Sequence, residues 1–352
     1  MNPQRQIIIF LCEKVVPRKC NILIMKTIFS LLILGGLFFS GCQEDPNIQL
    51  DGFRTKPVIY SVIESLDSVH FIKLGRFFSG YSNPAQTARI ADSIYFNSAN
   101  IKVTLVNLAG KMVDVPVERV TRTGKEQGFF NSDDYALYRF EKKLVHGQSP
   151  YISLAYEYVY IEVDIPELPK AVCSTSLVFP PKFWSPVDAQ QFIYIFPDNP
   201  VRVLWSGGEW NEIDVTFKIM EEYRDSTVTQ VFALQKSNDI LINGKYYEIK
   251  IPYELIVEIL QKNLKVRTDL VRRYFGPFRI EVLTGNADYY NYQKYIGGIN
   301  DYNFNPFGNV QNGIGILSAR SKMVKKALYL DQVSRLKFAS DSTLRKFNFI
   351  EY

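Results

Sequence analysis

Two neighbouring stretches decide the fold of this chain: Lys56–Glu64 (KPVIYSVIE) and Asp67–Phe78 (DSVHFIKLGRFF). Both are rich in β-branched and aromatic residues, which favour extended strands over helices. Ser65 and Leu66 separate them and supply a short turn. The sequence therefore predicts a pair of strands joined by this turn.

Strand-like runs of the same kind continue along most of the chain, without long helical patterns between them. In Tyr151–Ile165, for example, Tyr156, Tyr158 and Tyr160 fall on one face, because side chains along a strand alternate with a period of two. Strands at this spacing predict a mainly β protein. We expect two β-sandwich units, immunoglobulin-like or transthyretin-like, the second with one or two packed helices.

Two proline clusters bear on the domain boundary. Pro166–Lys170 holds two prolines and Phe179–Pro186 holds three. Such clusters interrupt regular structure and mark connections between domains. We place the boundary at the second cluster, which predicts an N-terminal β-sandwich domain over 56–187 and a C-terminal β-rich domain over 188–352.

The periodicity changes within the C-terminal domain. Apolar residues at Leu255, Ile256, Ile259, Leu260 and Leu264 follow helical spacing. The sequence predicts one amphipathic helix over 252–265, packed on the sheet, with Pro252 at its start. Further expected helices are Ala287–Tyr295 and Asp331–Phe338, and further expected strands include Ser93–Phe96, Ile314–Ala319, Val324–Leu330 and Lys346–Ile350.

The N-terminal region contains the stretch Met25–Cys42 (MKTIFSLLILGGLFFSGC). Lys26 supplies the positive charge near its start, an apolar run too short to span a bilayer follows, and small residues precede the cysteine. This is the lipobox pattern of bacterial lipoproteins, in which the cysteine thiol carries the lipid. We therefore expect lipidation at Cys42. A transmembrane anchor and an ordinary signal peptide with an incidental cysteine are the alternatives.

A signal sequence normally begins close to its charged residues, which favours Met25 over Met1 as the start of translation. In either case residues 1–41 are expected to be a leader, with 25–41 as the signal peptide. Residues 42–55 are polar and read as a flexible tether. Glu44 and Asp45 within it resemble an export signal for the cell surface, and a solvated linker is the other interpretation.

Removal of the leader changes the charge and the cysteine count. The whole chain has 41 basic and 36 acidic residues; residues 1–41 hold five of the former and one of the latter, which leaves 36 and 35. A nearly neutral protein gives no support for nucleic-acid binding. Cys173 is the one cysteine left besides Cys42, so no internal disulfide is expected. We interpret Cys173 as a small buried apolar residue.

The sequence shows no catalytic, metal-binding or cofactor-binding constellation. His70 and His146 belong to no spaced ligand set, and no serine lies in a Gly-x-Ser-x-Gly context. Glu221 and Glu222 are adjacent in an expected strand, so their carboxylates diverge. Two weaker alternatives stay open: calcium binding at Asp133-Asp134 or Asp198-Asn199, and sugar stacking on Trp184, Trp205 or Trp210. We expect no cofactor and no catalytic residue.

Several segments carry a resemblance to a known family: Lys56–Tyr60, Asp67–Arg76, Ala91–Phe96, Asn199–Trp205 and Asn309–Leu317. Together they resemble an uncharacterised lipoprotein family of the Bacteroidota, classed as a domain of unknown function. The resemblance covers most of the chain after Cys42 and carries no catalytic motif. It implies a β-sandwich lipoprotein of the outer membrane, encoded beside TonB-dependent receptors.

These observations lead to one favoured function and two alternatives. The favoured function is a non-enzymatic binding or accessory lipoprotein, anchored to the outer membrane through Cys42 on its surface or periplasmic face. Its expected partner is a TonB-dependent receptor. The first alternative is a surface hydrolase acting on glycans or peptides, and the second is a structural adhesin.

Overall fold

The computed structural model describes residues 55–77, 84–124, 135–147, 153–238, 246–296 and 308–351. The chain divides into two units, Met1–Gly52 and Phe53–Tyr352, and every described residue belongs to the second. The leader 1–41, the lipidation residue Cys42 and nearly all of the tether 42–55 lie outside the described residues. Those expectations stay predictions.

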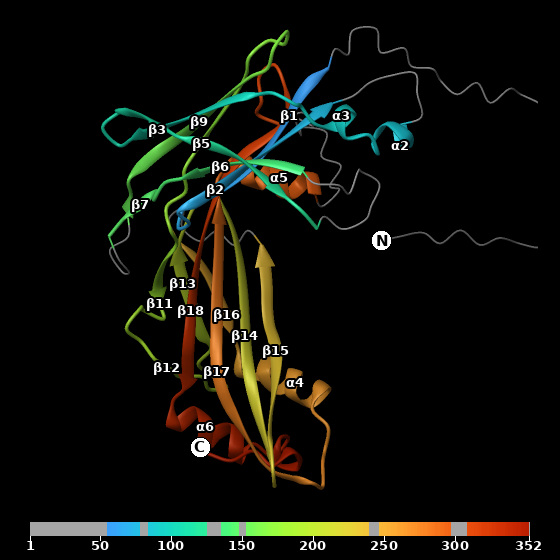
Figure 1. The fold of residues 1–352 in the computed structure, drawn as a ribbon. Helices are drawn as coiled ribbons and strands as arrows, with labels where there is room; N and C mark the ends of the chain where they lie inside the picture. Colours follow the sequence, from blue (N-terminus) through green and yellow to red (C-terminus); the bar gives the residue numbers. More distant parts are fainter. Residues whose placement is uncertain are drawn as a thin grey trace, which may run out of the picture. The chain divides into compact units, whose positions relative to one another are not determined.

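The described part of the chain is mainly β, which confirms the expected fold class. Figure 1 shows the order of its strands and helices. The strands are β1 Lys56–Glu64, β2 Val69–Phe77, β3 Asn100–Asn107, β4 Met112–Val115, β5 Val117–Arg122, β6 Tyr135–Glu141, β7 Val145–His146, β8 Ser153–Leu154, β9 Tyr156–Asp164, β10 Ala171–Ser176, β11 Lys182–Ser185, β12 Phe192–Ile193, β13 Val201–Ser206, β14 Trp210–Tyr223, β15 Thr227–Asn238, β16 Tyr247–Ile251, β17 Leu270–Gly285 and β18 Ile314–Leu330. The helices are α2 Pro84–Thr87, α3 Ala91–Ile94, α4 Tyr253–Asn263, α5 Ala287–Ile296, α6 Gln332–Ser340 and the 3-10 turn Arg345–Phe347.

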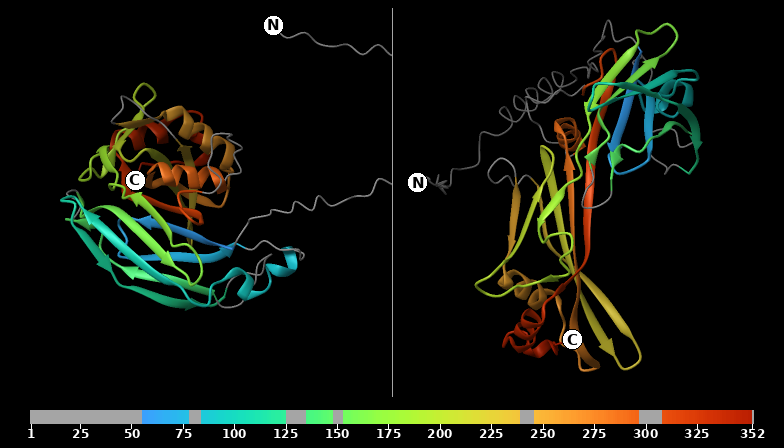
Figure 2. Two further views of the ribbon diagram at one scale, coloured as in Figure 1. Left: turned by 90° about the horizontal axis from the view of Figure 1, so that it is seen from above. Right: turned by 90° about the vertical axis from the view of Figure 1, so that its left-hand side faces the viewer.

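The largest sheet joins strands from both halves of the chain. Its order is β15-β14-β17-β18-β1-β2-β6-β5, and β12 pairs with the far end of β18. The expected hairpin β1–β2 is present, with Lys56 opposite Phe77. β18 runs parallel to β1 at its start and antiparallel to β17 afterwards, and Figure 2 shows it as one long red strand. Gly315 has φ +114, and a Cβ there would collide with the Ile59 carbonyl, so this glycine permits the β1–β18 pairing.

The first core lies between two sheets. Inward residues of β1, β2 and β6, such as Ile59, Ile72 and Phe140, belong to one buried cluster with residues of the four-stranded sheet β10-β9-β3-β4, such as Val103 and Ile161. The alternation of buried and exposed residues along β1 matches a strand with one face in the core. Burial of each such large side chain contributes about 1.5–3 kcal/mol.

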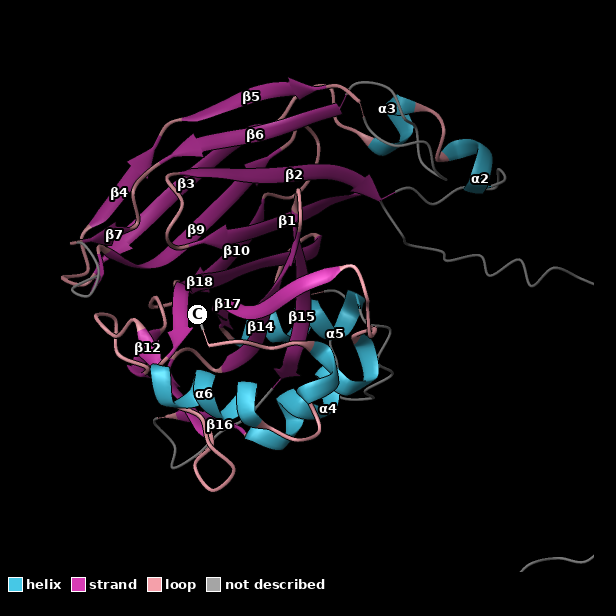
Figure 3. Ribbon diagram, turned by 90° about the horizontal axis from the view of Figure 1, so that it is seen from below, coloured by secondary structure: helices cyan, strands magenta, loops and turns pink. Residues whose placement is uncertain are grey.

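The second core joins the long strands β14, β15 and β17 to the three-stranded sheet β11-β13-β16 and to two helices. Helix α4 buries Tyr253, Ile256 and Leu260. The ring of Tyr253 stacks on Phe338 of α6 with centroids 4.4 Å apart, and its hydroxyl donates to Asp341 Oδ2 at 2.7 Å. Figure 3 shows these two helices next to each other. The apolar face of α4 is therefore a core face, as its spacing indicates.

A buried ion pair fixes the C-terminal segment to β17. Arg273 is fully buried, and its Nε donates to Glu221 Oε1 at 2.7 Å. Its two terminal nitrogens donate to the carbonyls of Phe347 at 3.0 Å and Lys265 at 2.8 Å. One guanidinium therefore ties β14, the segment after α4 and the C-terminal segment together.

Several local expectations need correction. The expected helix 252–265 is α4, and it begins after Pro252 and ends at Asn263. Ser93–Phe96 is wrong as a strand, because Ser93 and Ile94 belong to the short helix α3. Lys346–Ile350 is wrong as a strand, because a 3-10 turn occupies Arg345–Phe347 and Phe349 makes only an isolated bridge to Arg273.

The expected domain boundary near 188 stays a prediction. The buried residues of β18 bear on this boundary. Leu317 and Ala319 of β18 belong to the first core, whereas Leu328 and Leu330 of the same strand belong to the second. The two expected strands 314–319 and 324–330 are therefore one element that contributes to both cores.

Candidate functional site

The candidate site begins at an irregularity in β18. Ile280 of β17 is opposite Lys325, whereas Phe278 is opposite Leu328, so β18 has one residue more than β17 between these pairs. Ala327 in this interval has φ +58, the left-handed region that residues other than glycine seldom adopt. This is a β-bulge, and bulges bend a strand and turn its side chains in new directions.

Lys325, the last paired residue before the bulge, is buried. Its residue exposure is 8%, and its Nζ donates to the carbonyl of Val187 in the connection between β11 and β12. The same carbonyl accepts from the backbone N–H of Gln190 at 2.9 Å. Further along, the backbone N–H of Tyr329 donates to the carbonyl of Gln191 at 2.8 Å. These bonds hold residues 187–191 against β18.

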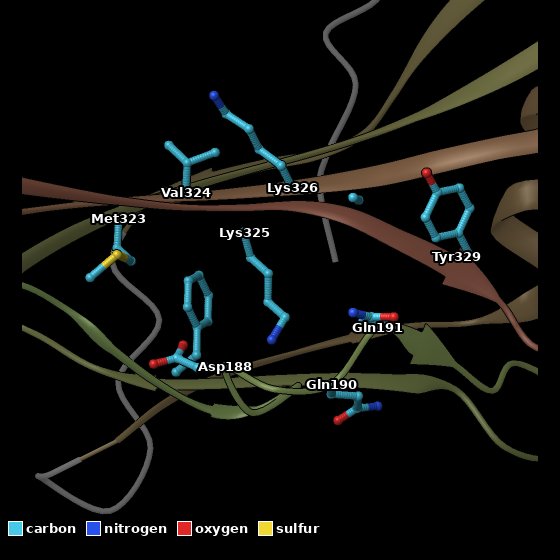
Figure 4. Close-up of a pocket in the computed structure, with 10 residues that line it drawn as sticks. Asp188, Gln190, Gln191, Met323, Val324, Lys325, Lys326 and Tyr329 are labelled. Atoms are coloured by element: carbon cyan, nitrogen blue, oxygen red, sulfur yellow. The ribbon is translucent and has the colours of Figure 1, made fainter. Parts of the chain in front are cut away.

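A pocket of about 450 Å³ lies between this connection and β18. Such a volume suits a small ligand. Its polar lining comes from Asp188, Gln190, Gln191, Lys325, Lys326 and Tyr329, with Phe183 and Met323 among the apolar residues. Figure 4 shows the Lys325 side chain pointing toward the connection that carries Asp188 and the two glutamines, whereas Lys326 points away from it.

Burial and the charge of Asp188 have opposite effects on the pKa of Lys325. Burial lowers the pKa of its ammonium group below the ordinary value, because the charged form loses hydration, and the negative charge of Asp188 opposes part of this effect. Asp188 therefore partly compensates the charge of Lys325.

Exposed aromatic side chains lie beside the pocket. Phe192 of β12 is the register partner of Tyr329 of β18, and their exposures are 55% and 42%. The next pair, Ile193 and Leu330, is buried. Because neighbouring residues of a strand point to opposite faces, Phe192 and Tyr329 share the outer face.

The three tryptophans predicted as possible sugar-stacking residues differ in their exposure to solvent. Trp205 and Trp210 are buried, with exposures of 1% and 4%, so their rings serve packing. Trp184 is exposed at 43% and contacts Tyr246 edge to face at 5.6 Å. Trp184 is the only exposed one of the three, Lys182 Nζ lies 4.4 Å from the centroid of its ring, and it is not part of the Lys325 pocket lining.

The remaining candidates from the sequence do not converge. Glu221 pairs with buried Arg273 and Glu222 pairs with Arg272, so the two carboxylates do diverge. Buried His70 has Nε2 3.1 Å from the Lys142 carbonyl, and burial lowers its pKa. His146 is exposed at the end of β7.

The described structure also places Cys173 and one of the two calcium-binding candidates. Cys173 is unpaired and buried in the first core, and burial, followed by the nearby charge of Asp288, raises the pKa of its thiol to about 12. Among the described residues no group of three His, Cys, Asp or Glu side chains is placed to hold a metal ion. Asp198 is exposed, and Asp133-Asp134 lies outside the described residues.

The sequence interpretation missed the Lys325 pocket. Lys325 lies within a run expected to be an ordinary strand, and the lysines at 325 and 326 give no sign of which one is buried. The only available signal is the interruption of apolar alternation at this pair. The pocket also needs Asp188 and Gln191, which are more than 130 positions away along the chain.

Comparisons with known proteins give no family for this chain. The scan against protein-family models has no match, and the search of curated proteins has none. Among solved structures, a DUF4785 family protein from Legionella pneumophila is similar at 10% identity and a TM-score of 0.20, over 66% of this chain and 53% of that one. A second is Dpr11 IG1 bound to DIP-gamma IG+IG2, at 8% identity and a TM-score of 0.19, over 76% of this chain and 97% of that one.

The first of these neighbours belongs to a family of unknown function, and the match spans about half of its length. Likenesses with TM-scores this low carry no argument about this chain. Within the described residues, no helix combines the length and the apolar composition that crossing a bilayer requires. The fold and the pocket together define the class: a mainly β protein with a polar pocket at a bulge in its longest strand.

Proposed function

We propose that this protein is a lipid-anchored binding protein of the outer membrane, held there through Cys42, which captures a small polar ligand in the Lys325 pocket. We further propose that it acts as an accessory partner of a TonB-dependent receptor, on the surface or periplasmic face of the membrane. The observation that carries the binding role is the buried ammonium of Lys325 in a pocket of about 450 Å³.

Three points support a binding role. A lysine is rarely buried, because its charge loses hydration; within the described residues the Nζ of Lys325 bonds to the Val187 carbonyl, and Asp188 lies near enough to attract it. The pocket lining includes side chains that donate and side chains that accept hydrogen bonds. The connection that forms one wall is attached to β18 by backbone hydrogen bonds, so the polar groups are held in place before a ligand arrives.

The lipid anchor and the partner rest on the sequence. Met25–Cys42 has the lipobox pattern, and the resemblance to Bacteroidota lipoproteins implies the outer membrane and the receptor. Several acyl chains on one cysteine hold a protein to a membrane firmly, whereas one chain holds it weakly.

The anchor is tested with two cysteine variants of the full chain expressed in its native membrane. We expect mass spectrometry to find acylated Cys42 at the mature N-terminus and Cys42→Ser to leave the membrane fraction. Cys173→Ser is the matched control and should stay in the membrane. An unacylated Cys42 in the wild-type protein would overturn the anchor.

The partner is tested by purifying the tagged wild-type protein from that membrane in mild detergent. We expect a β-barrel receptor of the TonB-dependent class to co-purify at near-equal stoichiometry. Recovery of the acylated protein without such a receptor would overturn the accessory role.

A further inference from the structure

We propose that the Lys325 pocket and the neighbouring aromatic pair Phe192–Tyr329 form one glycan-binding site, whose ligand is a short neutral oligosaccharide. One sugar ring lies on the exposed aromatic pair, and the hydroxyl groups of the adjoining sugar bond to Lys325, Asp188 and Gln191. This inference deepens the proposed function, because it names the ligand class of the same pocket.

The pocket can both donate and accept hydrogen bonds. The Lys325 ammonium has three N–H donors, and one of them bonds to the Val187 carbonyl. Gln190 uses its amide nitrogen on the Phe192 carbonyl at 2.7 Å, which leaves its amide oxygen for another donor. For the Gln191 side chain, no hydrogen bond is found within the described residues. The pocket thus offers donors and acceptors together, as a ligand with many hydroxyl groups requires.

The charged residues of the pocket favour a neutral ligand. Lys325 points into the pocket and the carboxylate of Asp188 lies near enough to attract it, while the Lys326 side chain points away. The lining therefore holds charges of both signs, Lys325 and Lys326 with Asp188. A ligand with net charge would leave one of these groups opposed by a like charge, whereas a hydroxyl group can accept from Lys325 and donate to Asp188.

An exposed aromatic pair borders the pocket. Phe192 and Tyr329 are adjacent on the outer face, and Tyr329 also lines the pocket. Large exposed aromatic side chains at a pocket mark a contact for a ligand with an apolar face. A sugar ring has such a face, formed by its C–H groups, together with polar edges. A free amino acid or another small zwitterion would satisfy the charges and leave the aromatic pair uncovered.

The test is a binding titration of the full-length protein against a defined panel. The probes are neutral trisaccharides of glucose, mannose, xylose and galactose, with trigalacturonate and a mixture of free amino acids for comparison. We expect at least one neutral trisaccharide to bind by calorimetry and by saturation-transfer NMR. We expect its Kd to rise about tenfold or more in Lys325→Met, because a hydrogen bond to a charged group is lost.

Two further variants and two controls make the test specific. Tyr329 and Gln191 are exposed, so Tyr329→Ala and Gln191→Ala should leave the fold intact, which thermal unfolding verifies. Each variant removes a proposed contact with the sugar and should therefore weaken binding. Trp184→Ala removes an exposed aromatic ring that is not part of the pocket lining, and Lys322→Met removes an exposed lysine of the same strand. Both controls should bind as the wild type does.

Some outcomes would overturn the inference. These are binding of none of the neutral trisaccharides, binding that Lys325→Met and Tyr329→Ala leave unchanged, or preference for trigalacturonate or amino acids. Any of them refutes the ligand class while receptor co-purification still supports the proposed function. Failure of the anchor and receptor tests refutes the proposed membrane role separately.

Discussion

Glu64, at the end of β1, should make the stability of this protein depend on pH. Its Oε2 lies 3.2 Å from Arg320 Nε, and its side chain is 14% exposed. Its other oxygen, Oε1, is buried without a hydrogen-bond partner in the described structure. Burial is the largest effect and raises the pKa of Glu64 from 4.5 to about 7; Arg320 and Lys322 oppose this, and Asp67 adds to it.

The folded protein holds the proton more tightly than the unfolded chain, so the stability from the neutral carboxyl is complete below pH 4.5 and is lost as the pH rises through about 7. Each tenfold difference in proton affinity corresponds to about 1.4 kcal/mol. Between pH 5 and pH 8, Glu64 should therefore lower the free energy of unfolding by about 2–3 kcal/mol.

Glu64→Gln isolates this effect, because the amide is uncharged at every pH and nearly the same size. The measurement is urea unfolding of the wild type and the variant at pH 5 and pH 8. We expect the variant to gain about 2–3 kcal/mol relative to the wild type over this range. The wild type provides the reference for all other titrating groups, whose contributions cancel in the difference.

The same substitution at Glu118 is the matched control, since its side chain is 68% exposed and its ion pair with Arg139 is on the surface. Glu118→Gln should change stability by less than about 0.5 kcal/mol at either pH. The reasoning is refuted if Glu64→Gln shows no pH-dependent difference, or if the variant becomes less stable than the wild type at pH 8.

Three further predictions concern the cores and the bulge. Arg273→Met leaves Glu221 buried without its partner and should lower the free energy of unfolding, measured in urea, by about 3–5 kcal/mol. Arg272→Met, at a part-exposed ion pair, should lower it by under about 1 kcal/mol. Equal losses in the two variants would contradict the structural role of the buried Arg273–Glu221 pair. Ala327→Gly relieves the positive φ of the bulge and should stabilise by about 0.5–1 kcal/mol, and a loss of stability would argue against the left-handed backbone there. The thiol of Cys173 is buried and its pKa is raised, so it should resist a thiol reagent at pH 8 in the native protein and react once urea unfolds the chain. Rapid labelling of the native protein would contradict this burial.

Much of the local structure could be predicted from the sequence because it depends on neighbouring residues. The hairpin β1–β2 follows from two strand-forming runs and a short turn, and α4 follows from helical spacing after Pro252. Two local expectations fail. Ser93–Phe96 has strand-like residues, yet the structure begins a helix at Ala91, and Lys346–Ile350 is held by Arg273 rather than by a sheet ladder.

The sequence alone could not give the pairing of β1 with β18. These strands are separated by about 250 positions along the chain, and the periodicity of a strand does not predict which distant strand pairs with it. The nine-stranded sheet and the contribution of β18 to both cores depend on this pairing. The same limit applies to the candidate site, since the connection at 187–191 meets β18 only in the folded chain.

By itself the sequence determined the mainly β class and the amphipathic helix α4, because strand propensity and helical period are properties of contiguous residues. The lipobox is also a contiguous pattern, and lipidation at Cys42 stays a prediction. The tertiary structure decided which of two adjacent lysines is buried, because Lys325 faces the connection that carries Val187 whereas Lys326 points away from it. It also decided that Trp205 and Trp210 pack inside the protein while Phe192 and Tyr329 remain exposed beside the pocket. Burial depends on what distant strands place against a residue, and that information is absent from any single stretch of the chain.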